Sequence, residues 1–347
     1  MRWAVSGGRF MKACVFGAGA IGGQLAMRLA RGGAEVSMVA RGEHLAAIRR
    51  DGLRIVLADG EWRERLPATQ DPRELGPQDM VVVTVKQPAL PEVARTIAPL
   101  LGPDTPVAFV MNGIPWWYFH GHGGPREGQR LDAIDPGSAI WNAVGPERAI
   151  GGVIYSAAEV VEPGVIHVEN ANGRLILGEP NGADSARVRN LAALINAGGL
   201  NTAVSTTIRD EVWTKLINNI ASGTLAVLAQ TTASGVYAEP ACEAAARTVY
   251  AELIKVAATL GAKPALDPDR NVARSKALNH KPSILQDLER GRPMEVASMF
   301  EAPLAMARIA GVPAPMTDLL VTLAAMRARA AGLYPAKAEA AVPEPMH

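Results

Sequence analysis

The chain has 347 residues, 48% of them hydrophobic, which is enough for two packed domains. Lysine and arginine total 35 against 34 aspartate and glutamate, so the net charge excludes a general electrostatic attraction to nucleic acid or to an anionic membrane. The two cysteines, Cys14 and Cys242, provide neither a disulfide framework nor a zinc pattern, which fits a cytoplasmic protein. The sequence contains neither a signal peptide nor an apolar run long enough to cross a membrane.

The chain begins with a segment of no predicted structure, followed by a strand, a helix and a second strand. We interpret residues 1–10 as a disordered extension, as the product of an upstream start codon or as a remnant of expression, and we expect them to carry no chemistry. Residues 12–17 are a short apolar run that ends in glycine, and residues 21–31 carry small and apolar side chains at helical spacing. Two glycines end this helix, and residues 34–40 predict the next strand, which completes a βαβ unit.

Later apolar runs continue the same domain. Residues 80–85 form a continuous run rich in β-branched side chains, and residues 107–111 form another run, both typical of parallel strands that are buried on both faces. The N-terminal domain is therefore predicted to be a doubly wound α/β sheet of the Rossmann type. Three shorter runs, at residues 153–155, 164–168 and 174–177, are separated by glycine or Asn-Gly turns, and we expect them to extend the sheet as antiparallel strands.

The C-terminal part of the chain has a different pattern. From residue 184 onward alanine and leucine recur at helical spacing, and no convincing strand follows Arg209. We therefore expect a Rossmann domain at residues 11–204, followed by an all-α domain at residues 205–334. Residues 335–347 contain three prolines and no periodicity, so we expect them to form a flexible tail.

A GxGxxG motif lies between the first strand and the first helix. In this context Gly17 permits a tight turn, Gly19 lets a pyrophosphate approach the backbone, and Gly22 permits close helix packing. The N-terminus of the following helix offers free N–H groups to the phosphates. The alternative is a glycine turn without a ligand. The predicted dinucleotide loop comprises Gly17, Ala18, Gly19, Ala20, Ile21 and Gly22.

The end of the second strand indicates which dinucleotide binds. Sites that prefer NAD usually have a carboxylate at this position, which accepts a hydrogen bond from the adenosine ribose. Here the strand is followed by Arg41 instead, and the next carboxylate is Glu43. A guanidinium suits a 2′-phosphate, so the sequence predicts NADPH as the cofactor. The alternative is that Arg41 is a solvated arginine at the start of the next helix.

Five motifs in chain order give the sequence a specific resemblance to the ketopantoate reductase (2-dehydropantoate 2-reductase) family, from residue 11 to about residue 333. They read GAGAIG at residues 17–22, VTVK at 83–86, MNG at 111–113, WTKLINN at 213–219, and SILQD at 283–287 with Glu295 after it. The resemblance implies an oxidoreductase that transfers hydride from NADPH to the keto carbon of ketopantoate and yields (R)-pantoate for pantothenate synthesis. It also implies a helical C-terminal domain like that of 6-phosphogluconate dehydrogenase.

The resemblance assigns the proton donor. Lys215 matches the family's general acid, and Asn219 lies one helical turn further along the same face as a substrate-binding residue. A ketone that accepts hydride develops alkoxide charge, which a positioned ammonium stabilises and protonates. The alternative is that Lys215 is a surface lysine on an amphipathic helix.

Ser283 and Glu295 match a substrate-binding serine and a catalytic glutamate of the family. Ser283 can donate to a substrate carboxylate, while Glu295 can accept from a substrate hydroxyl and favour the charged form of Lys215. Two alternatives stay open. Ser283 could be a helix N-cap with Gln286 three residues later, and Glu295 could be an exposed helix residue.

Two further residues of the motifs follow predicted strands. Lys86 and Asn112 match family residues that border the nicotinamide and the substrate, and each follows a buried strand at its carboxyl end. Ligands of open α/β sheets bind at this edge. The alternative for Asn112 is that Asn-Gly is only a turn.

The sequence departs from the family pattern at three places. Gly223 and His280 stand where family members usually have asparagine, and the loss of an amide at Gly223 leaves space for a bulkier acid. The segment 115–136 is longer than usual and begins with aromatics at 116–119, which could form a pocket wall or lid, or pack under the loop or against a second subunit. His120 and His122 in this segment do not form a metal pattern, so we predict no metal site.

These departures leave a second reading open, reduction of a bulkier 2-oxo acid, or oxidation of the matching 2-hydroxy acid, on the same scaffold. A non-catalytic nucleotide-binding regulator is a more remote alternative, because it would not require Lys215, Asn219, Ser283 and Glu295 together. In either enzymatic reading the partner is a small-molecule 2-oxo acid rather than nucleic acid or membrane. A homodimer is compatible with the sequence, from which the oligomeric state does not follow.

Overall fold

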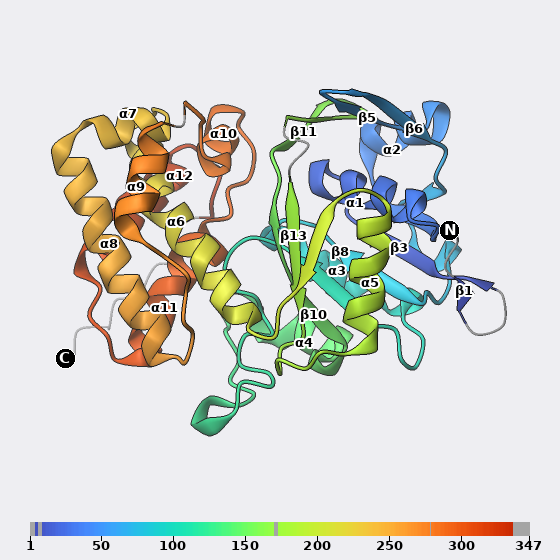
Figure 1. Cartoon of the computed structure of the whole chain (residues 1–347), viewed down its shortest axis with the longest axis horizontal. Coiled ribbons are helices and arrows are strands. Elements are labelled where there is room, and N and C mark those ends of the chain that lie inside the picture. The colour runs from blue at the N-terminus through green and yellow to red at the C-terminus, as the bar shows by residue number, and fades with distance from the viewer. Residues whose placement is uncertain (1–3, 6–8, 170–172, 278, 336–347) are drawn as a thin grey trace, which may run out of the picture. The chain divides into compact units, whose positions relative to one another are not determined.

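The computed structural model describes residues 4–5, 9–169, 173–277 and 279–335, and the chain divides into two compact units (Figure 1). The first takes in the chain up to Leu216 together with Ala262–Ala265, and the second takes in Ile217–Gly261 and the chain from Leu266 onward. We expected the second domain to begin near residue 205. The division instead falls inside α6 (Ile208–Ala229), because the first turns of this helix bond to the first unit.

An eight-stranded sheet is the centre of the first unit. Its strand order is β14-β13-β10-β9-β8-β3-β4-β7, and all neighbouring pairs are parallel except β10 with β13. The parallel strands are buried on both faces, as expected for a sheet covered by helices. The bounds are β3 (Lys12–Phe16), β4 (Glu35–Val39), β7 (Ala68–Thr69), β8 (Met80–Val83), β9 (Val107–Val110), β10 (Ala149–Tyr155), β13 (Arg174–Gly178) and β14 (Asn201–Val204).

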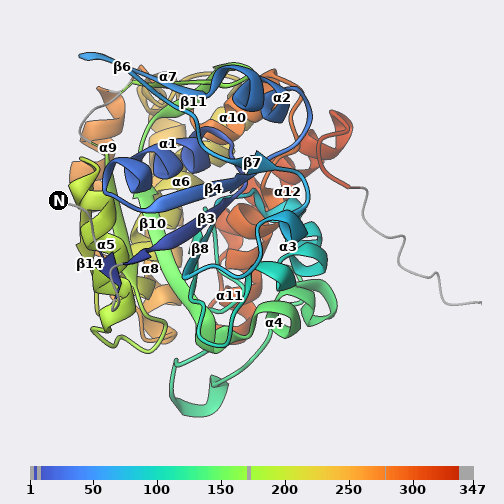
Figure 2. The same ribbon diagram turned by 90° about the vertical axis from the view of Figure 1, so that its right-hand side faces the viewer.

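Helices cover both faces of this sheet (Figure 1; Figure 2). On one face α1 packs against α5, and on the other α3 packs against α4. The predicted α/β fold of the Rossmann type is confirmed. The α-helices are α1 (Ala20–Arg31), α2 (Gly42–Asp51), α3 (Leu90–Thr96), α4 (Ala139–Val144) and α5 (Ala186–Ala197), and the short 3-10 turns are η1 (Pro72–Glu74), η2 (Gln87–Ala89), η3 (Ala98–Leu100), η4 (Gly124–Arg126), η5 (Pro136–Ser138) and η6 (Pro146–Arg148).

A second sheet corrects one of the expectations. Its order is β11-β12-β5-β6, with bounds β11 (Ala158–Glu162), β12 (Val165–Val168), β5 (Leu53–Leu57) and β6 (Gly60–Glu64). The strand expected at 164–168 therefore does not extend the main sheet. It pairs instead with β5 and β11, because this small sheet buries its apolar face against α1. The close approach needs Gly23 in α1, where a Cβ would lie 2.2 Å from Ile166 Cδ1.

The N-terminal extension has a described part. Ala4–Val5 (β1) and Arg9–Phe10 (β2) pair as short antiparallel strands, while residues 1–3 and 6–8 lie outside the described residues. We expected the whole segment to be disordered. The four described residues form paired strands instead, because hydrogen bonds between strands require only backbone N–H and C=O groups and no apolar core.

The second unit is helical, as predicted. Of the described residues, none after β14 forms a strand. The expected tail begins at Pro335, and residues 336–347 lie outside the described part. No described helix is long and apolar enough to span a membrane. Besides the C-terminal part of α6, the unit contains α7 (Ala233–Ala238), α8 (Pro240–Thr259), α9 (Pro268–Lys276), α10 (Ser283–Glu289), the π-helical turn η7 (Ala297–Glu301), α11 (Ala302–Ala310) and α12 (Pro315–Ala330).

Candidate active site

The glycine-rich turn joins β3 to α1 at the place the sequence predicts. Gly17 has a φ of 101°, and a Cβ there would lie 2.6 Å from Val85 Cγ1. A Cβ on Gly22 would lie 1.9 Å from Gly17 O and 2.4 Å from Thr84 Oγ1, so a larger residue would push α1 off the turn. A Cβ on the exposed Gly19 would meet no atom within 4 Å, so the backbone here is open to a ligand.

The start of α1 offers hydrogen-bond donors beside this turn. Gly19 is the N-cap residue and carries no side chain that could cap the first N–H groups. Gly17 N donates to Val39 O (3.0 Å), so the turn lies directly against the end of β4. The predicted phosphate loop and the end of the second strand are therefore neighbours in the structure.

Arg41 lies two residues beyond the end of β4. It is exposed and has extended backbone geometry as the N-cap of α2. Ala40 N donates to Thr69 O (2.9 Å), which ties this segment to the edge strand β7. Arg41 thus follows the strand whose end bonds to the glycine turn, and its role toward a 2′-phosphate stays a prediction.

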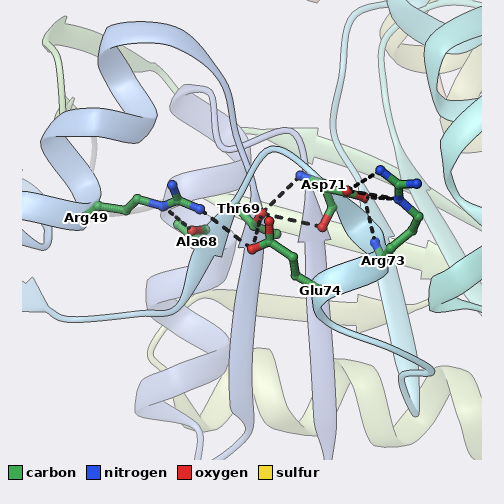
Figure 3. A network of polar contacts seen from close by, with 6 residues as sticks. All are labelled: Arg49, Ala68, Thr69, Asp71, Arg73 and Glu74. Atoms are coloured by element: carbon green, nitrogen blue, oxygen red, sulfur yellow. Dashed lines mark hydrogen bonds and ion pairs between the residues drawn. The ribbon is translucent and has the colours of Figure 1, made fainter.

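A polar network shapes the chain just after β7 (Figure 3). Thr69 Oγ1 donates to Glu74 Oε2 (2.8 Å) and accepts from Asp71 N (3.0 Å). Arg49 Nε donates to Ala68 O (2.8 Å), and its guanidinium lies 3.8 Å from Glu74. Hydrogen bonds from Arg73 hold the pKa of Asp71 below its ordinary value. Both carboxylates of the network are therefore engaged by neighbouring donors.

His44 connects α2 to the glycine turn, a role that the sequence analysis missed. Its Nδ1 accepts from Gly164 N (2.9 Å), so Nε2 carries the hydrogen and donates to Ala18 O (2.7 Å). Burial lowers the pKa of His44 below 6.5, and the hydrogen bond to Ala18 partly opposes this shift. The sequence around His44 does not indicate this link, because the two hydrogen-bond partners are 26 and 120 residues away along the chain.

This geometry predicts a pH-dependent loss of stability. Below pH 6.5 the unfolded chain takes up a proton on His44 that the folded chain takes up only at lower pH, so the free energy of unfolding falls as the pH drops through this window. Denaturant titrations from about pH 7.5 to about pH 5.5 should show a smaller loss in His44→Gln than in the parent protein. His280→Gln, at an exposed histidine, is the matched control and should retain the parental slope. Equal pH slopes for His44→Gln and the parent would contradict this role.

Lys215 and Asn112 meet at the carboxyl edge of the main sheet. Lys215 Nζ donates to Asn112 Oδ1 (2.8 Å), across 103 residues of sequence, and to Ile154 O (2.5 Å). Asn112 follows β9 and Ile154 belongs to β10, and because these strands are parallel their carboxyl ends lie at one edge. The half-buried ammonium is thus oriented by two fixed oxygen atoms. The alternative, a surface lysine on an amphipathic helix, is wrong, because Lys215 is half-buried and donates to two protein oxygen atoms.

Contacts from the first turns of α6 hold this helix in the first unit. Trp213 Nε1 donates to Tyr118 OH (2.8 Å). The Arg209 guanidinium donates to three backbone carbonyls, those of Tyr118 (2.7 Å), His120 (2.7 Å) and Pro180 (2.5 Å). The sequence analysis missed Arg209, since nothing local distinguishes an arginine that satisfies distant carbonyls from one in solvent.

The aromatic segment at 116–119 is part of the core of the first unit. Each of its four side chains is at most 2% exposed. Trp116 makes an edge-to-face contact with Phe109 (5.2 Å between ring centroids), and Trp117 packs on Gly151, where a Cβ would lie 2.5 Å from its ring. The structure therefore bears out packing under the loop, and the expectation of a lid or pocket wall is wrong for these residues.

Lys86 also follows a strand of the sheet. It comes after β8, is exposed, and precedes η2, whose Gln87 Nε2 donates to Ile134 O (3.1 Å). Because β8 and β9 are parallel neighbours, Lys86 and Asn112 follow strands that end at the same edge. Their predicted contacts with nicotinamide and substrate stay predictions.

The second unit contains Asn219, Ser283 and Glu295. Asn219 is half-buried on α6, and Ser283 is the exposed first residue of α10. The cap alternative for Ser283 is wrong, because Pro282 is the N-cap and Gln286 Nε2 donates to Lys281 O (3.0 Å). Glu295 is only 6% exposed, so the alternative of an exposed helix residue is also wrong.

The contacts of Gly223 favour a packing role over a lost substrate contact. A Cβ there would lie 3.4 Å from Ile284 Cγ2 and 3.8 Å from Phe300 Cζ, both apolar. The room at Gly223 is therefore enough for a methyl group in ordinary contact.

His280, the second departure from the family pattern, is an exposed loop residue whose carbonyl accepts from Ala233 N (3.3 Å).

Two substitutions at Gly223 test this packing. Gly223→Ala should raise the free energy of unfolding by about 0.5–1 kcal/mol, because alanine is the better helix former. Gly223→Asn should lower it by about 1–3 kcal/mol, because the amide would lie against two apolar side chains. Denaturant titration measures both changes. A folded Gly223→Asn variant whose kcat/KM ratio shifts from an aromatic 2-oxo acid toward ketopantoate would contradict a pure packing role.

Comparison with known proteins supplies the family. The family model described as ketopantoate reductase PanE/ApbA matches residues 13–122, and the model of its C-terminal part matches residues 207–328. A 2-dehydropantoate 2-reductase of Mesorhizobium japonicum is 43% identical over 327 residues, which cover 93% of this chain and all of the relative.

Solved structures agree with this match. A structure from Ralstonia solanacearum MolK2 is 36% identical with a TM-score of 0.88, over 94% of this chain and all of that chain. The 2-dehydropantoate 2-reductase of Geobacter metallireducens GS-15 is 28% identical with a TM-score of 0.79, over 90% of this chain and 99% of its own. The chain therefore belongs to the ketopantoate reductase family.

Proposed function

We propose that this protein reduces 2-dehydropantoate (ketopantoate) to (R)-pantoate with NADPH, a step of pantothenate biosynthesis in the cytoplasm. The observation that carries the proposal is the ammonium of Lys215, held by Asn112 Oδ1 and Ile154 O at the edge of the sheet where α/β proteins bind their ligands. The full-length similarity to a relative named 2-dehydropantoate 2-reductase supports the choice of substrate.

The residues of the first unit fit a bound dinucleotide. The open backbone at Gly19 and the start of α1 can hold a pyrophosphate, and Arg41 can pair with a 2′-phosphate. Loop residues Ala18, Ala20 and Ile21 would contribute backbone groups, while Lys86 and Asn112 would border the nicotinamide end. When bound, NADPH supplies the hydride.

Lys215 would act on the substrate oxygen. The keto oxygen gains negative charge as the carbonyl carbon accepts hydride, and a nearby ammonium stabilises this charge. One N–H bond of Nζ then breaks, its proton forms the new hydroxyl, and the lysine is left as a neutral amine until solvent reprotonates it. Asn112 and Ile154 would hold Nζ in one orientation, which avoids an entropic cost during the reaction.

The residues of the helical unit would bind the substrate. We propose that Asn219 and Ser283 donate hydrogen bonds to its polar groups, while Glu295 accepts from its hydroxyl. The burial of Glu295 supports this role, because a carboxylate is seldom buried without a functional or structural partner. The alternative hypothesis, in which the protein reduces a bulkier 2-oxo acid, loses support. The aromatics at 116–119 were expected to contact such an acid, but they are enclosed in the core.

A substrate panel tests the proposal. NADPH oxidation is measured with 2-dehydropantoate and with aliphatic and aromatic 2-oxo acids, and the product is identified by chiral chromatography. We expect the highest kcat/KM with 2-dehydropantoate and (R)-pantoate as its product. Turnover of an aromatic 2-oxo acid with none of 2-dehydropantoate would overturn the assignment.

A further inference from the structure

We propose that Tyr155 is a positioning residue for the Lys215 ammonium, acting through the face of its aromatic ring. The inference rests on the proposed function, in which Lys215 is the proton donor. Tyr155 is the last residue of β10 and follows Ile154, whose carbonyl accepts from Lys215. The ammonium nitrogen lies 5.5 Å from the centroid of the Tyr155 ring, within the range of a cation–π interaction.

The ring of Tyr155 is itself held in place. Tyr155 pairs with Arg174 on the neighbouring antiparallel strand β13, and the Arg174 guanidinium lies 4.4 Å from the ring centroid. Burial raises the pKa of Glu211 on α6, and the positive charge of Arg174 opposes this shift, so Arg174 also lies within electrostatic reach of α6. Strand pairing and a second cation thus fix the ring, and a fixed ring can orient the lysine.

The ring and the two oxygen atoms act together on Lys215. A lysine has four rotatable side-chain bonds, and proton delivery to one substrate oxygen requires one arrangement of them. Asn112 Oδ1 and Ile154 O bind two N–H groups, and the electron-rich ring face attracts the ammonium as a whole. Without the ring, the ammonium would sample other positions, so fewer enzyme molecules would be competent at any moment.

The expected effect falls on turnover. Tyr155→Leu should lower kcat about tenfold, while Tyr155→Phe, which keeps the ring face, should stay within about twofold of the parent. The Kd for NADPH should change less than about twofold in both variants, because the ring acts on the proton donor. Rates are expressed per folded molecule, with the folded fraction taken from circular dichroism.

Fluorinated phenylalanines at position 155 make the test specific. Each added fluorine weakens the negative ring face with little change in size, so kcat should fall stepwise from phenylalanine through its mono-, di- and trifluoro forms. A purely structural ring would show no such gradient. The same series at Phe109 is the matched control, because this buried ring on β9 packs edge-to-face against Trp116. The kcat of the variants fluorinated at position 109 should stay constant.

The outcomes separate this inference from the proposed function. A falling series at position 155 with a constant series at Phe109 supports the role of Tyr155. A constant series at 155, together with a large loss of turnover in Lys215→Ala, overturns only the positioning role. If Lys215→Ala kept the parental turnover, the proton donor of the proposed function would be wrong, and the role of Tyr155 would be wrong with it.

Discussion

Lys215→Ala is expected to lower the turnover of 2-dehydropantoate at least about a hundredfold while NADPH affinity stays within about twofold. The ammonium stabilises charge that appears only as hydride arrives, so its loss affects the transition state more than the bound ground state. Steady-state NADPH oxidation and fluorescence titration of the cofactor measure the two quantities separately.

Stability must be followed in the same variant. Lys215→Ala removes the donor for Asn112 Oδ1 and Ile154 O, which costs about 1–3 kcal/mol if water does not replace it. Lys255→Ala, at an exposed lysine of α8, is the matched control and should keep the parental turnover. Added methylamine should restore part of the activity of Lys215→Ala by replacing the missing ammonium. Near-parental turnover in a folded Lys215→Ala variant would remove this residue from the proton-donor role.

Arg41→Ala should remove most of the proposed preference for NADPH over NADH. A charged hydrogen bond to the 2′-phosphate contributes about 1–3 kcal/mol, so the ratio of kcat/KM values for the two cofactors should fall roughly ten- to hundredfold. The loss should appear mainly in the KM for NADPH, and the KM for NADH should hardly change, because NADH has no phosphate at this position.

Arg49→Ala is the matched control for this prediction. Arg49 is an exposed arginine of α2, the helix whose N-cap is Arg41, but its Nε donates to Ala68 O and its guanidinium lies beside Glu74 (Figure 3). The cofactor preference of this variant should match the parent. Equal use of NADPH and NADH by the parent protein would show that Arg41 does not select the cofactor.

The βαβ unit and its glycine motif could be predicted from the sequence because their causes are local. A positive φ at Gly17 and the close contact at Gly22 each require glycine whatever the rest of the chain does. Buried strands and amphipathic helices likewise reveal themselves by the spacing of neighbouring residues. The family motifs added Lys215 and Asn112, which no periodicity could have paired across 103 residues.

Strand partners, burial of loops and the division into units were decided only by the tertiary structure. The strand at residues 165–168 has an apolar pattern that suits either sheet, and it joined the smaller one because α1 offers a surface to cover. The aromatics at 116–119 are core residues because Trp116 packs on Phe109, Trp117 packs on Gly151, and Tyr118 bonds to Trp213. The bonds of Arg209 and Trp213 to Tyr118 also place the first turns of α6 in the first unit.

The sequence by itself determined the α/β and helical classes, the glycine turn and the candidate proton donor. The tertiary structure decided the contacts of His44, Tyr155 and Arg209, whose partners lie far away in sequence. The physical reason is that local patterns act through neighbouring residues and hold in many folds. A long-range contact instead depends on which of several alternative packings buries the most apolar surface while satisfying every backbone polar group.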